Sequence, residues 1–317
     1  MEEPFRSHAR YLKDRYGAVA YRVAVDAGFG CPNREGGGTG CSYCGQSGSR
    51  APYLPPTVDE EPAGLRRQVD GALGFLRRRY GAQVFLLYFQ AFSGTHAPVE
   101  RLRLIYDEGL SLAPFRELIV STRPDCVDGQ KAALLASYRT PERDVWVELG
   151  LQSAQDPTLS RIRRGHSVAD FERAYFLLKP LGIKVGVHLI FGLPGETAAD
   201  MEATMRYVAG LRPDGVKFHN LHVSRGAALY GEFQKGEVSA PGPRAHLEYV
   251  IRALELLPPD TVILRLVCDT PSECLAAPRM FPPKAEFRQL LMRTMEERAT
   301  RQGRLFPYPP PPDRAVH

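Results

Sequence analysis

The sequence lacks any apolar run of the roughly 18 residues that a membrane-spanning helix requires. Its first residues, Met1-Glu-Glu-Pro-Phe-Arg, contain no apolar segment, so we expect no secretory signal. We therefore expect a cytoplasmic protein with no membrane partner, in a compartment where disulfide bonds are rare. With 44% hydrophobic residues among 317, disorder of most of the chain is also excluded.

Two nucleotide-binding motifs are absent as well. The sequence contains no P-loop, and Gly28-Phe-Gly30 is followed by Asn33 where a dinucleotide-binding fingerprint has its third glycine. Positive charge is only slightly in excess. The sequence has 41 Lys and Arg and 36 Asp and Glu, which gives a net charge of +5. Arginines cluster at 66–67, 77–79 and 161–164. These clusters permit an RNA partner, but a solvated helix face explains each of them more simply.

Six apolar runs suited to strands alternate with segments of helical periodicity. The expected strands are 18–25, 83–89, 117–121, 145–151, 184–191 and 215–223. The expected helices between them are 60–80, 98–110, 130–138, 169–181 and 197–211. This order predicts an α/β fold with a parallel sheet and right-handed crossovers, either doubly wound or a complete or partial barrel.

The end of the chain has a different character. A run at 261–268 adds a strand or leads into a C-terminal extension, and helices are expected at 245–257 and 285–302. We divide the chain into a core (1–240), an extension (241–303) and a Pro-rich tail (304–317). Four consecutive prolines in the tail favour an extended or disordered terminus over a helix or a central strand.

Three cysteines give the strongest local signal. Cys31, Cys41 and Cys44 follow the first expected strand directly, so they lie on a loop at the carboxyl end of the sheet, where α/β folds bind ligands. The CxxC spacing of Cys41 and Cys44 directs two sulfurs to one metal or cluster. The Gly-rich segment before Cys41 allows Cys31 to fold back as a third ligand.

Three kinds of site remain open from this spacing. A structural zinc site usually has four ligands, and no second CxxC or HxxxH pair with suitable spacing follows. A [4Fe-4S] cluster on three thiolates leaves one iron free to bind another molecule. A redox-active CxxC requires neither Cys31 nor the glycines. Spacing alone does not separate zinc from iron–sulfur, and both are more plausible than the redox motif.

Several motifs together resemble the radical S-adenosylmethionine superfamily. Tyr43 precedes the last cysteine, and the nine residues between the first two cysteines, where most of that superfamily has three, resemble the Elongator catalytic subunit branch. Five further runs resemble the YhcC/YtqA-like family over residues 5–300: Tyr88-Phe-Gln90-Ala-Phe, Ser121-Thr-Arg-Pro-Asp, Glu148-Leu-Gly-Leu-Gln152-Ser, Arg164-Gly-His and His188-Leu-Ile190-Phe-Gly192-Leu-Pro-Gly-Glu.

The resemblance implies a partial (β/α)6 barrel of the TIM type with a C-terminal helical extension. It implies a [4Fe-4S] cluster on Cys31, Cys41 and Cys44, whose open iron binds S-adenosylmethionine. One electron, from a donor such as flavodoxin or ferredoxin, then yields a 5′-deoxyadenosyl radical that abstracts hydrogen from the substrate. Such a radical requires a dry, closed barrel interior.

Alternation along two strands predicts which side chains face that interior. Val145, Val147, Leu149 and Leu151 form one apolar face of the fourth strand, which places Glu148 and Gln152 on the other face. In the fifth strand the same pattern places His188 and Ile190 inside. We therefore expect Glu148, Gln152 and His188 to converge, with Arg164 reaching the same opening.

Roles for these residues follow from the resemblance only. Matching positions in oxygen-independent coproporphyrinogen oxidases imply that Gln152 and Arg164 contact the amino-acid part of the cofactor, with His188 at the ribose. The motifs also place Tyr43, Gln90, Ser93, Ile190 and Gly192 at the cofactor. Glu148 is a candidate catalytic residue, and pairing with a buried arginine is an equal alternative. Cys126, Cys268 and Cys274 lack ligand spacing with one another and are expected to be ordinary thiols.

Members of the resembled branch act on the wobble uridine of tRNA, and the YhcC/YtqA-like family is linked to the aminomethyl side chain at carbon 5 of that base. The leading hypothesis is therefore a radical enzyme that modifies this side chain, with tRNA as its substrate. Two alternatives stay open. One is a radical enzyme for a small molecule, and the other is a zinc-stabilised RNA-binding module without turnover.

Overall fold

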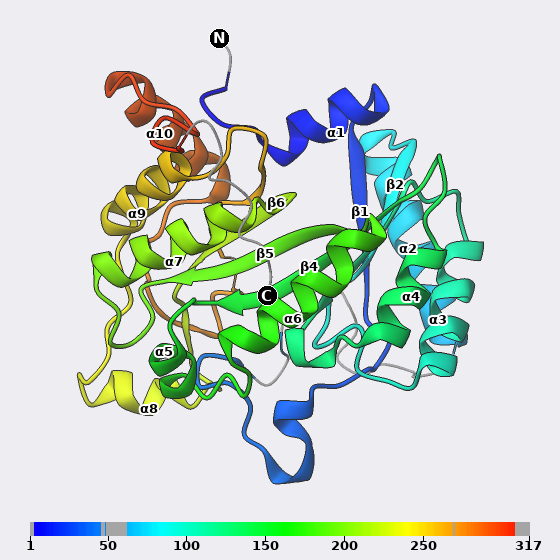
Figure 1. Cartoon of the computed structure of the whole chain (residues 1–317), viewed down its shortest axis with the longest axis horizontal. Coiled ribbons are helices and arrows are strands. Elements are labelled where there is room, and N and C mark those ends of the chain that lie inside the picture. Colours follow the sequence, from blue (N-terminus) through cyan, green and yellow to red (C-terminus); the bar gives the residue numbers. More distant parts are fainter. Residues whose placement is uncertain (1–2, 46–47, 49–61, 269, 308–317) are drawn as a thin grey trace.

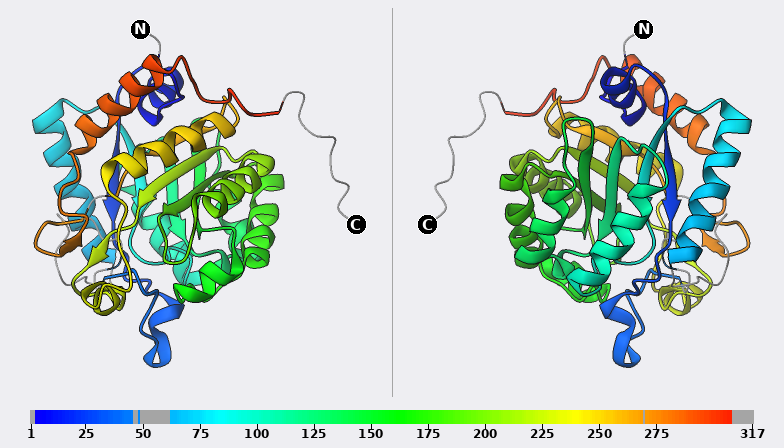
Figure 2. Two further views of the ribbon diagram at one scale, coloured as in Figure 1. Left: turned by 90° about the vertical axis from the view of Figure 1, so that its left-hand side faces the viewer. Right: turned by 90° about the vertical axis from the view of Figure 1, so that its right-hand side faces the viewer.

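Seven strands form one parallel sheet that curls into part of a barrel (Figures 1 and 2). The computed structural model describes residues 3–45, 48, 62–268 and 270–307. The strands lie in the order β1 (Ala20–Val25), β2 (Val84–Phe89), β3 (Glu117–Thr122), β4 (Asp144–Gln152), β5 (Lys184–Phe191), β6 (Gly215–Asn220) and β8 (Val262–Arg265). The predicted partial barrel is therefore confirmed, and the run at 261–268 adds its seventh strand.

Helices cover the outer, convex face of the sheet (Figure 2). They are α2 (Pro62–Tyr80), α3 (Val99–Ser111), α4 (Gly129–Ser137), α6 (Val168–Leu178), α7 (Ala198–Leu211) and α9 (Pro243–Leu256). The last helix, α10 (Lys284–Glu297), packs against α9 and pairs with the start of the chain through Arg288 and Glu3. Shorter elements are α5 (Asp156–Arg161), α8 (Leu229–Gln234) and the 3₁₀ turns η1 (Pro32–Gly37), η2 (Pro124–Cys126) and η3 (Lys179–Leu181). Reciprocal capping boxes, Ser167 with Asp170 and Thr197 with Asp200, fix where α6 and α7 begin.

The two faces of the sheet carry different side chains, as alternation predicts. Val145, Val147, Leu149 and Leu151 are fully or almost fully buried in the large core beneath the helices. The inner face carries a second apolar cluster, which contains Leu86, Ile119, Trp146 and Val262, with Leu264 packed against it. A Cβ on Gly186 would lie 2.8 Å from Cδ1 of Leu264, so the glycine there makes room for this packing.

An additional helix, α1 (His8–Tyr16), completes the inner cluster at the amino-terminal end of the strands. Tyr11 and Leu12 of α1 are buried in it, and the Tyr11 ring meets Trp146 edge-on at 5.8 Å. Ser7 caps the helix, and Gly17 ends it in the left-handed conformation. Apolar packing thus fills most of this end of the inner face, with a few polar side chains among it, such as Lys184, which donates to the Tyr11 hydroxyl at 2.8 Å.

The structure corrects two predicted boundaries. The run at 215–223 is not one strand, because β6 ends at Asn220 and β7 (Val223–Ser224) pairs antiparallel with β9 (Leu275–Ala277). The helix predicted at 285–302 ends at Glu297, because the side-chain amide of Gln302 donates to the carbonyls of Pro258 and Thr261 and fixes a return of the chain.

The ends of two predicted segments lie outside the described residues. These are the start of the helix predicted at 60–80 and residues 308–317 of the expected tail. Just before residue 308, the Leu305 backbone amide donates to the carbonyl of Glu255 at 2.8 Å, and Phe306 packs on the core. Among the described helices, none is long and apolar enough to span a membrane.

Candidate functional site

The three cysteines lie on the loop that follows β1, which projects from the carboxyl end of the sheet (blue in Figure 1). Between Cys31 and Cys41 the chain forms η1, and the Cys44 amide donates to the Cys41 carbonyl at 3.0 Å, which makes the CxxC segment a tight turn. Gly40 precedes Cys41 with φ of +76°, a conformation that favours glycine.

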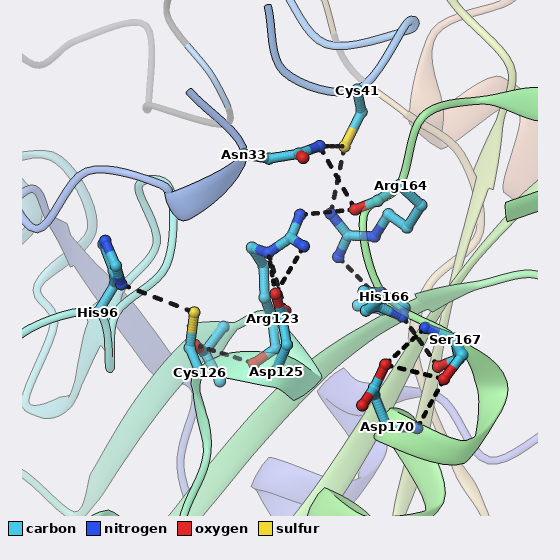
Figure 3. A network of polar contacts seen from close by, with 12 residues as sticks. Asn33, Cys41, His96, Arg123, Asp125, Cys126, Arg164, His166, Ser167 and Asp170 are labelled. Carbon is cyan, nitrogen blue, oxygen red and sulfur yellow. Dashed lines mark hydrogen bonds and ion pairs between the residues drawn. The ribbon is translucent and has the colours of Figure 1, made fainter. Parts of the chain in front are cut away.

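Nitrogen donors contact two of the thiols, and Figure 3 shows those of Cys41. Asn33 donates from Nδ2 to Sγ of Cys41 at 3.4 Å, and Arg164 donates from Nη1 to the same sulfur at 3.5 Å. Arg34 donates from Nη2 to Sγ of Cys44 at 3.2 Å. Burial opposes ionisation of both thiols, but the Arg164 guanidinium and Asn33 hold the pKa of Cys41 below its ordinary value, whereas burial raises the pKa of Cys44.

The chemistry of the three thiols is compatible with an iron–sulfur cluster. Within the described part of the chain, no three His, Cys, Asp or Glu side chains converge as one metal ion requires. Zinc would need every sulfur about 2.3 Å from one point, whereas the cysteines of an iron–sulfur cluster bind different irons and stay apart. The N–H donors on Cys41 and Cys44 suit thiolate ligands. Three thiols, two of them with N–H donors, thus fit an iron–sulfur cluster.

Arg164 connects the cysteine loop to the end of β4. Its Nη2 donates to the Gly150 carbonyl at 2.8 Å, and His166 Nε2 lies 3.0 Å from the same oxygen. A Cβ at Gly150 would lie 2.6 Å from both Arg164 Nη2 and the Gln152 amide nitrogen. The β-bulge between Gly150 and Gln152, with φ of +75° at Gln152, places that amide over Gly150. Arg164 Nε is buried without a hydrogen-bond partner, which leaves a donor free for a ligand.

Sequence reasoning missed Arg123, which holds Arg164 in place (Figure 3). Arg123 is 3% exposed, pairs with Asp125 through two nitrogens, and donates from Nη1 to the Arg164 carbonyl at 2.8 Å. Asn33 donates to the Arg163 carbonyl at 2.7 Å and so joins the cysteine loop to the same turn. Arg123 lies in the family motif Ser121-Thr-Arg-Pro-Asp, which could have marked it as a site residue. Its contacts with Arg164 and Asp125 could not be predicted from the sequence.

Glu148 is the centre of a second polar cluster, on the inner face of the sheet. Its Oε2 accepts hydrogen bonds from Tyr88 at 2.7 Å and Lys217 at 2.9 Å and lies 2.8 Å from His188 Nε2. Its Oε1 forms an ion pair with Arg22 at 2.9 Å. Glu148 and His188 thus meet as predicted, whereas Gln152 lies with Arg164 over Gly150. The ion pair with Arg22 matches the arginine pairing that the sequence left open as an alternative, and Tyr88 and Lys217 are partners that sequence reasoning did not assign to this carboxylate.

Burial and charge perturb these groups strongly. Burial alone would raise the pKa of Glu148, but the charges of Arg22 and Lys217 and the contact with His188 hold it well below its usual range. Burial, with the nearby charge of Lys217, lowers the pKa of His188 to about 4. Burial lowers the pKa of Lys217 to about 7, against the attraction of Glu148. The carboxylate is therefore ionised and His188 neutral near pH 7.

The other residues predicted for the cofactor lie near or after the carboxyl ends of β1, β2 and β5. Tyr43 packs on an apolar cluster that includes Ile190, Ile162 and Leu229. Gln90 and Ser93 follow β2. The backbone amide of Gln90 donates to the carbonyl of Val25, and that of Ser93 donates to the carbonyl of Gly30. Gly192 has φ of +84°, and a Cβ there would lie 2.1 Å from Pro241, so this turn requires glycine.

Some of the remaining thiols and clustered arginines are buried, and others lie at the surface. Cys126 is buried, which raises its pKa to about 11, and its sulfur lies 3.9 Å from His96 Nδ1; Cys274 is exposed. Arg161 pairs with Glu232, whereas Arg164 of the same cluster is buried in the site. Arg77, Arg78 and Arg79 lie in the last turn of α2.

Comparison with known proteins decides the family. The radical SAM superfamily profile matches residues 27–208, and a radical SAM C-terminal domain matches residues 213–297. The chain belongs to the radical SAM superfamily. This radical SAM enzyme is 31% identical to the uncharacterized protein YtqA of Bacillus subtilis over 96% of the chain and 94% of YtqA. It is 35% identical to the protein YhcC of Escherichia coli over 84% of each, so the predicted YhcC/YtqA-like family is confirmed.

Similarity to Elongator is narrower. Elongator complex protein 3 of Danio rerio is 30% identical over 49% of this radical SAM enzyme and 28% of its own length. The structure of Elp3 from the archaeon Methanocaldococcus infernus superposes with a TM-score of 0.66 at 20% identity, covering 89% of the enzyme and 64% of that chain. The enzyme thus spans less than two thirds of the Elp3 chain, and the match establishes a shared fold.

Proposed function

We propose that Cys31, Cys41 and Cys44 hold a [4Fe-4S] cluster that binds S-adenosylmethionine. The observation that carries this proposal is the position of three thiols on the first βα loop, two of them with arginine donors, in a chain of the radical SAM superfamily. When bound, the cluster supplies one electron that splits the sulfonium and gives a 5′-deoxyadenosyl radical, which abstracts hydrogen from the substrate.

The enzyme's own residues orient the cofactor and exclude water. Arg164, whose Nε has no partner, and Gln152 lie together over Gly150 and would hold the amino-acid part of the cofactor. His188 would contact the ribose, held by its contact with Glu148. Tyr43, Gln90, Ser93, Ile190 and Gly192 would complete the surface around it. The apolar plug that contains Tyr11 and Trp146 closes the other end of the inner face, which protects a radical from water.

The proposed substrate is tRNA, modified on the carbon-5 side chain of its wobble uridine. Similarity to Elongator complex protein 3 over about half of the chain supports this choice. An external donor such as flavodoxin or ferredoxin would deliver the electron, and the cytoplasmic location expected from the sequence stays a prediction. The division at residues 240 and 303 is likewise a proposal.

The test combines metal analysis with a search for a modified nucleoside. Anaerobically reconstituted enzyme should contain about four irons with equal sulfide and no stoichiometric zinc. With reductant, S-adenosylmethionine and tRNA, digestion and mass spectrometry should reveal a changed nucleoside at the wobble position. Loss of tRNA binding as salt rises would support an RNA substrate. Cofactor cleavage without RNA binding would instead favour a small-molecule substrate, and zinc without sulfide would favour the binding-module alternative.

A further inference from the structure

Three polar side chains form one layer across the inner face of the sheet. In the register, His188 of β5 is opposite Lys217 of β6, and Lys217 is opposite Arg265 of β8. The layer lies directly above the apolar plug, since Trp146 and Leu264 fill the space below it. It therefore faces the carboxyl ends of the strands, the side that carries the cysteine loop.

A β-bulge brings Arg265 into this layer. Val216 pairs with Ile263 and Lys217 pairs with Arg265, so the register skips Leu264. In a regular strand Arg265 would share the face of Ile263, which packs in the outer core. The bulge redirects it toward Lys217, as bulges beside functional sites often do. Consistent with this placement, the pKa values of His188, Lys217 and His219 are low mainly because these groups are buried, and the charge of Arg265 lowers them further.

The layer has more positive charge than its carboxylate can balance. Glu148 already pairs with Arg22 and Lys217. The guanidinium of Arg265 has no hydrogen-bonding or acidic partner among the residues that the structure describes, and it is only half-buried. The imidazole of His219 likewise has no hydrogen-bond partner in the described chain, and its ring lies 5.8 Å from the His188 ring. Two donors thus face the interior unused.

We propose that Arg265 and His219, beside Lys217, bind a carboxylate carried by the substrate. The inference rests on the proposed function, because it assigns this site to the part of the base that enters the interior. A guanidinium presents two parallel N–H donors to a carboxylate, and a second donor from a neutral imidazole fits the remaining oxygen lone pairs. Partial removal from water strengthens such contacts.

The carboxylate is assigned to the substrate and not to the cofactor because of where Arg265 lies. Arg265 lies on β8, which β5 and β6 separate from β4 in the sheet. The residues proposed for the cofactor's amino-acid part, Gln152 and Arg164, lie at the end of β4, where Arg164 also contacts Cys41. Lys217 and His188 separate Arg265 from that corner.

The experiment compares two anticodon stem–loops that differ in one group. Their wobble uridines carry a carbon-5 side chain ending either in a carboxylate or in the uncharged amide of the same size, and binding is measured at fixed salt. Wild-type enzyme should bind the carboxylate form roughly 10- to 100-fold more tightly, as expected for a charge-assisted contact. Arg265→Gln should reduce this preference to within about 2-fold, and Arg265→Lys should retain part of it.

Matched controls keep the outcomes distinct. Arg244→Gln removes an exposed arginine from α9 and should preserve the preference, while iron content and circular dichroism report on folding. Equal binding of both stem–loops by wild type, equal weakening of both by Arg265→Gln, or weaker binding of S-adenosylmethionine alone would each overturn the carboxylate site. If wild type binds neither stem–loop, the proposed RNA substrate falls, and this inference with it.

Discussion

Arg164 donates from Nη1 to the sulfur of Cys41 across 3.5 Å, although 123 residues separate them in the sequence. Through this contact the turn after β4 reaches the loop after β1, and both ends of the contact belong to motifs quoted from the sequence. Hydrogen bonds and positive charge near a cluster sulfur favour the reduced, more negative state. Arg164 therefore links cluster chemistry to the residues proposed for the cofactor.

The first prediction concerns the potential of the cluster. Arg164→Gln removes a charged donor and should lower the midpoint potential of the reconstituted cluster by on the order of 50 mV, close to a factor of ten for one electron. Arg164→Lys keeps the charge, and its midpoint potential should lie between those of wild type and Arg164→Gln. An EPR-monitored redox titration makes the comparison. Identical potentials in all three proteins would show that the contact does not tune the cluster.

Glu148→Gln should destabilise the fold strongly. The change leaves Arg22 and Lys217 facing a neutral amide in a buried site, and breaking a buried charge pair costs about 3–5 kcal/mol. Glu248→Gln is the matched control, because its pairing with Arg298 is at the surface and is expected to be worth less than about 1 kcal/mol. Urea unfolding near neutral pH measures both. A loss for Glu148→Gln no larger than that of the control would contradict the account.

Glu117 predicts a dependence of stability on pH. It is buried on β3 and accepts a hydrogen bond from Tyr16, and burial raises its pKa to about 7. Between pH 4.5 and 7 the folded protein keeps this proton while the unfolded chain has lost it, so the group's contribution to stability falls as pH rises. Glu117→Gln should therefore become more stable relative to wild type as pH rises from 4.5 to 8, by about 2–3 kcal/mol at most.

The check is a set of urea unfolding curves for both proteins across that pH range. The informative quantity is the difference between the two proteins, because it cancels the histidines whose low pKa shapes the curve of each, such as His166 and His246. A difference that is independent of pH would mean that Glu117 titrates normally.

His188→Ala should weaken binding of S-adenosylmethionine by roughly 10-fold without removing iron. The imidazole is neutral and contacts Glu148. It lies on the same face of β5 as Ile190, two residues before it, and outside the cysteine loop. His188→Gln, which keeps a donor for Glu148, should lose less. Equilibrium binding to the reconstituted enzyme measures the effect. Unchanged affinity would remove His188 from the cofactor site, and lost iron would mean that it supports the loop.

Much of the fold was predictable because local patterns agree with it. β5 has the predicted bounds, and alternation along β4 places Glu148 inside and Val147 outside. α1 was missed, because most of its side chains are polar and only Tyr11 and Leu12 are buried. Its role in closing the barrel depends on a contact with Trp146, far away in the sequence.

The site was predictable in its residue types and only partly in its contacts. The cysteine spacing and the Arg164-Gly-His run identified real neighbours. The partners of Glu148, above all Lys217 of β6, depend on how five strands align. The position of Arg265 depends on a β-bulge, which shifts the pairing by one residue and leaves no mark in a single sequence.

Release of 5′-deoxyadenosine by the reconstituted enzyme tests the central claim most directly. Wild type, Cys44→Ala and the exposed-thiol control Cys274→Ala are each given dithionite and S-adenosylmethionine under anaerobic conditions, with iron, sulfide and zinc assayed on the same samples. The account predicts about four irons and 5′-deoxyadenosine from wild type and the control, and neither from folded Cys44→Ala. Stoichiometric zinc without sulfide, or undiminished cleavage by Cys44→Ala, would contradict it.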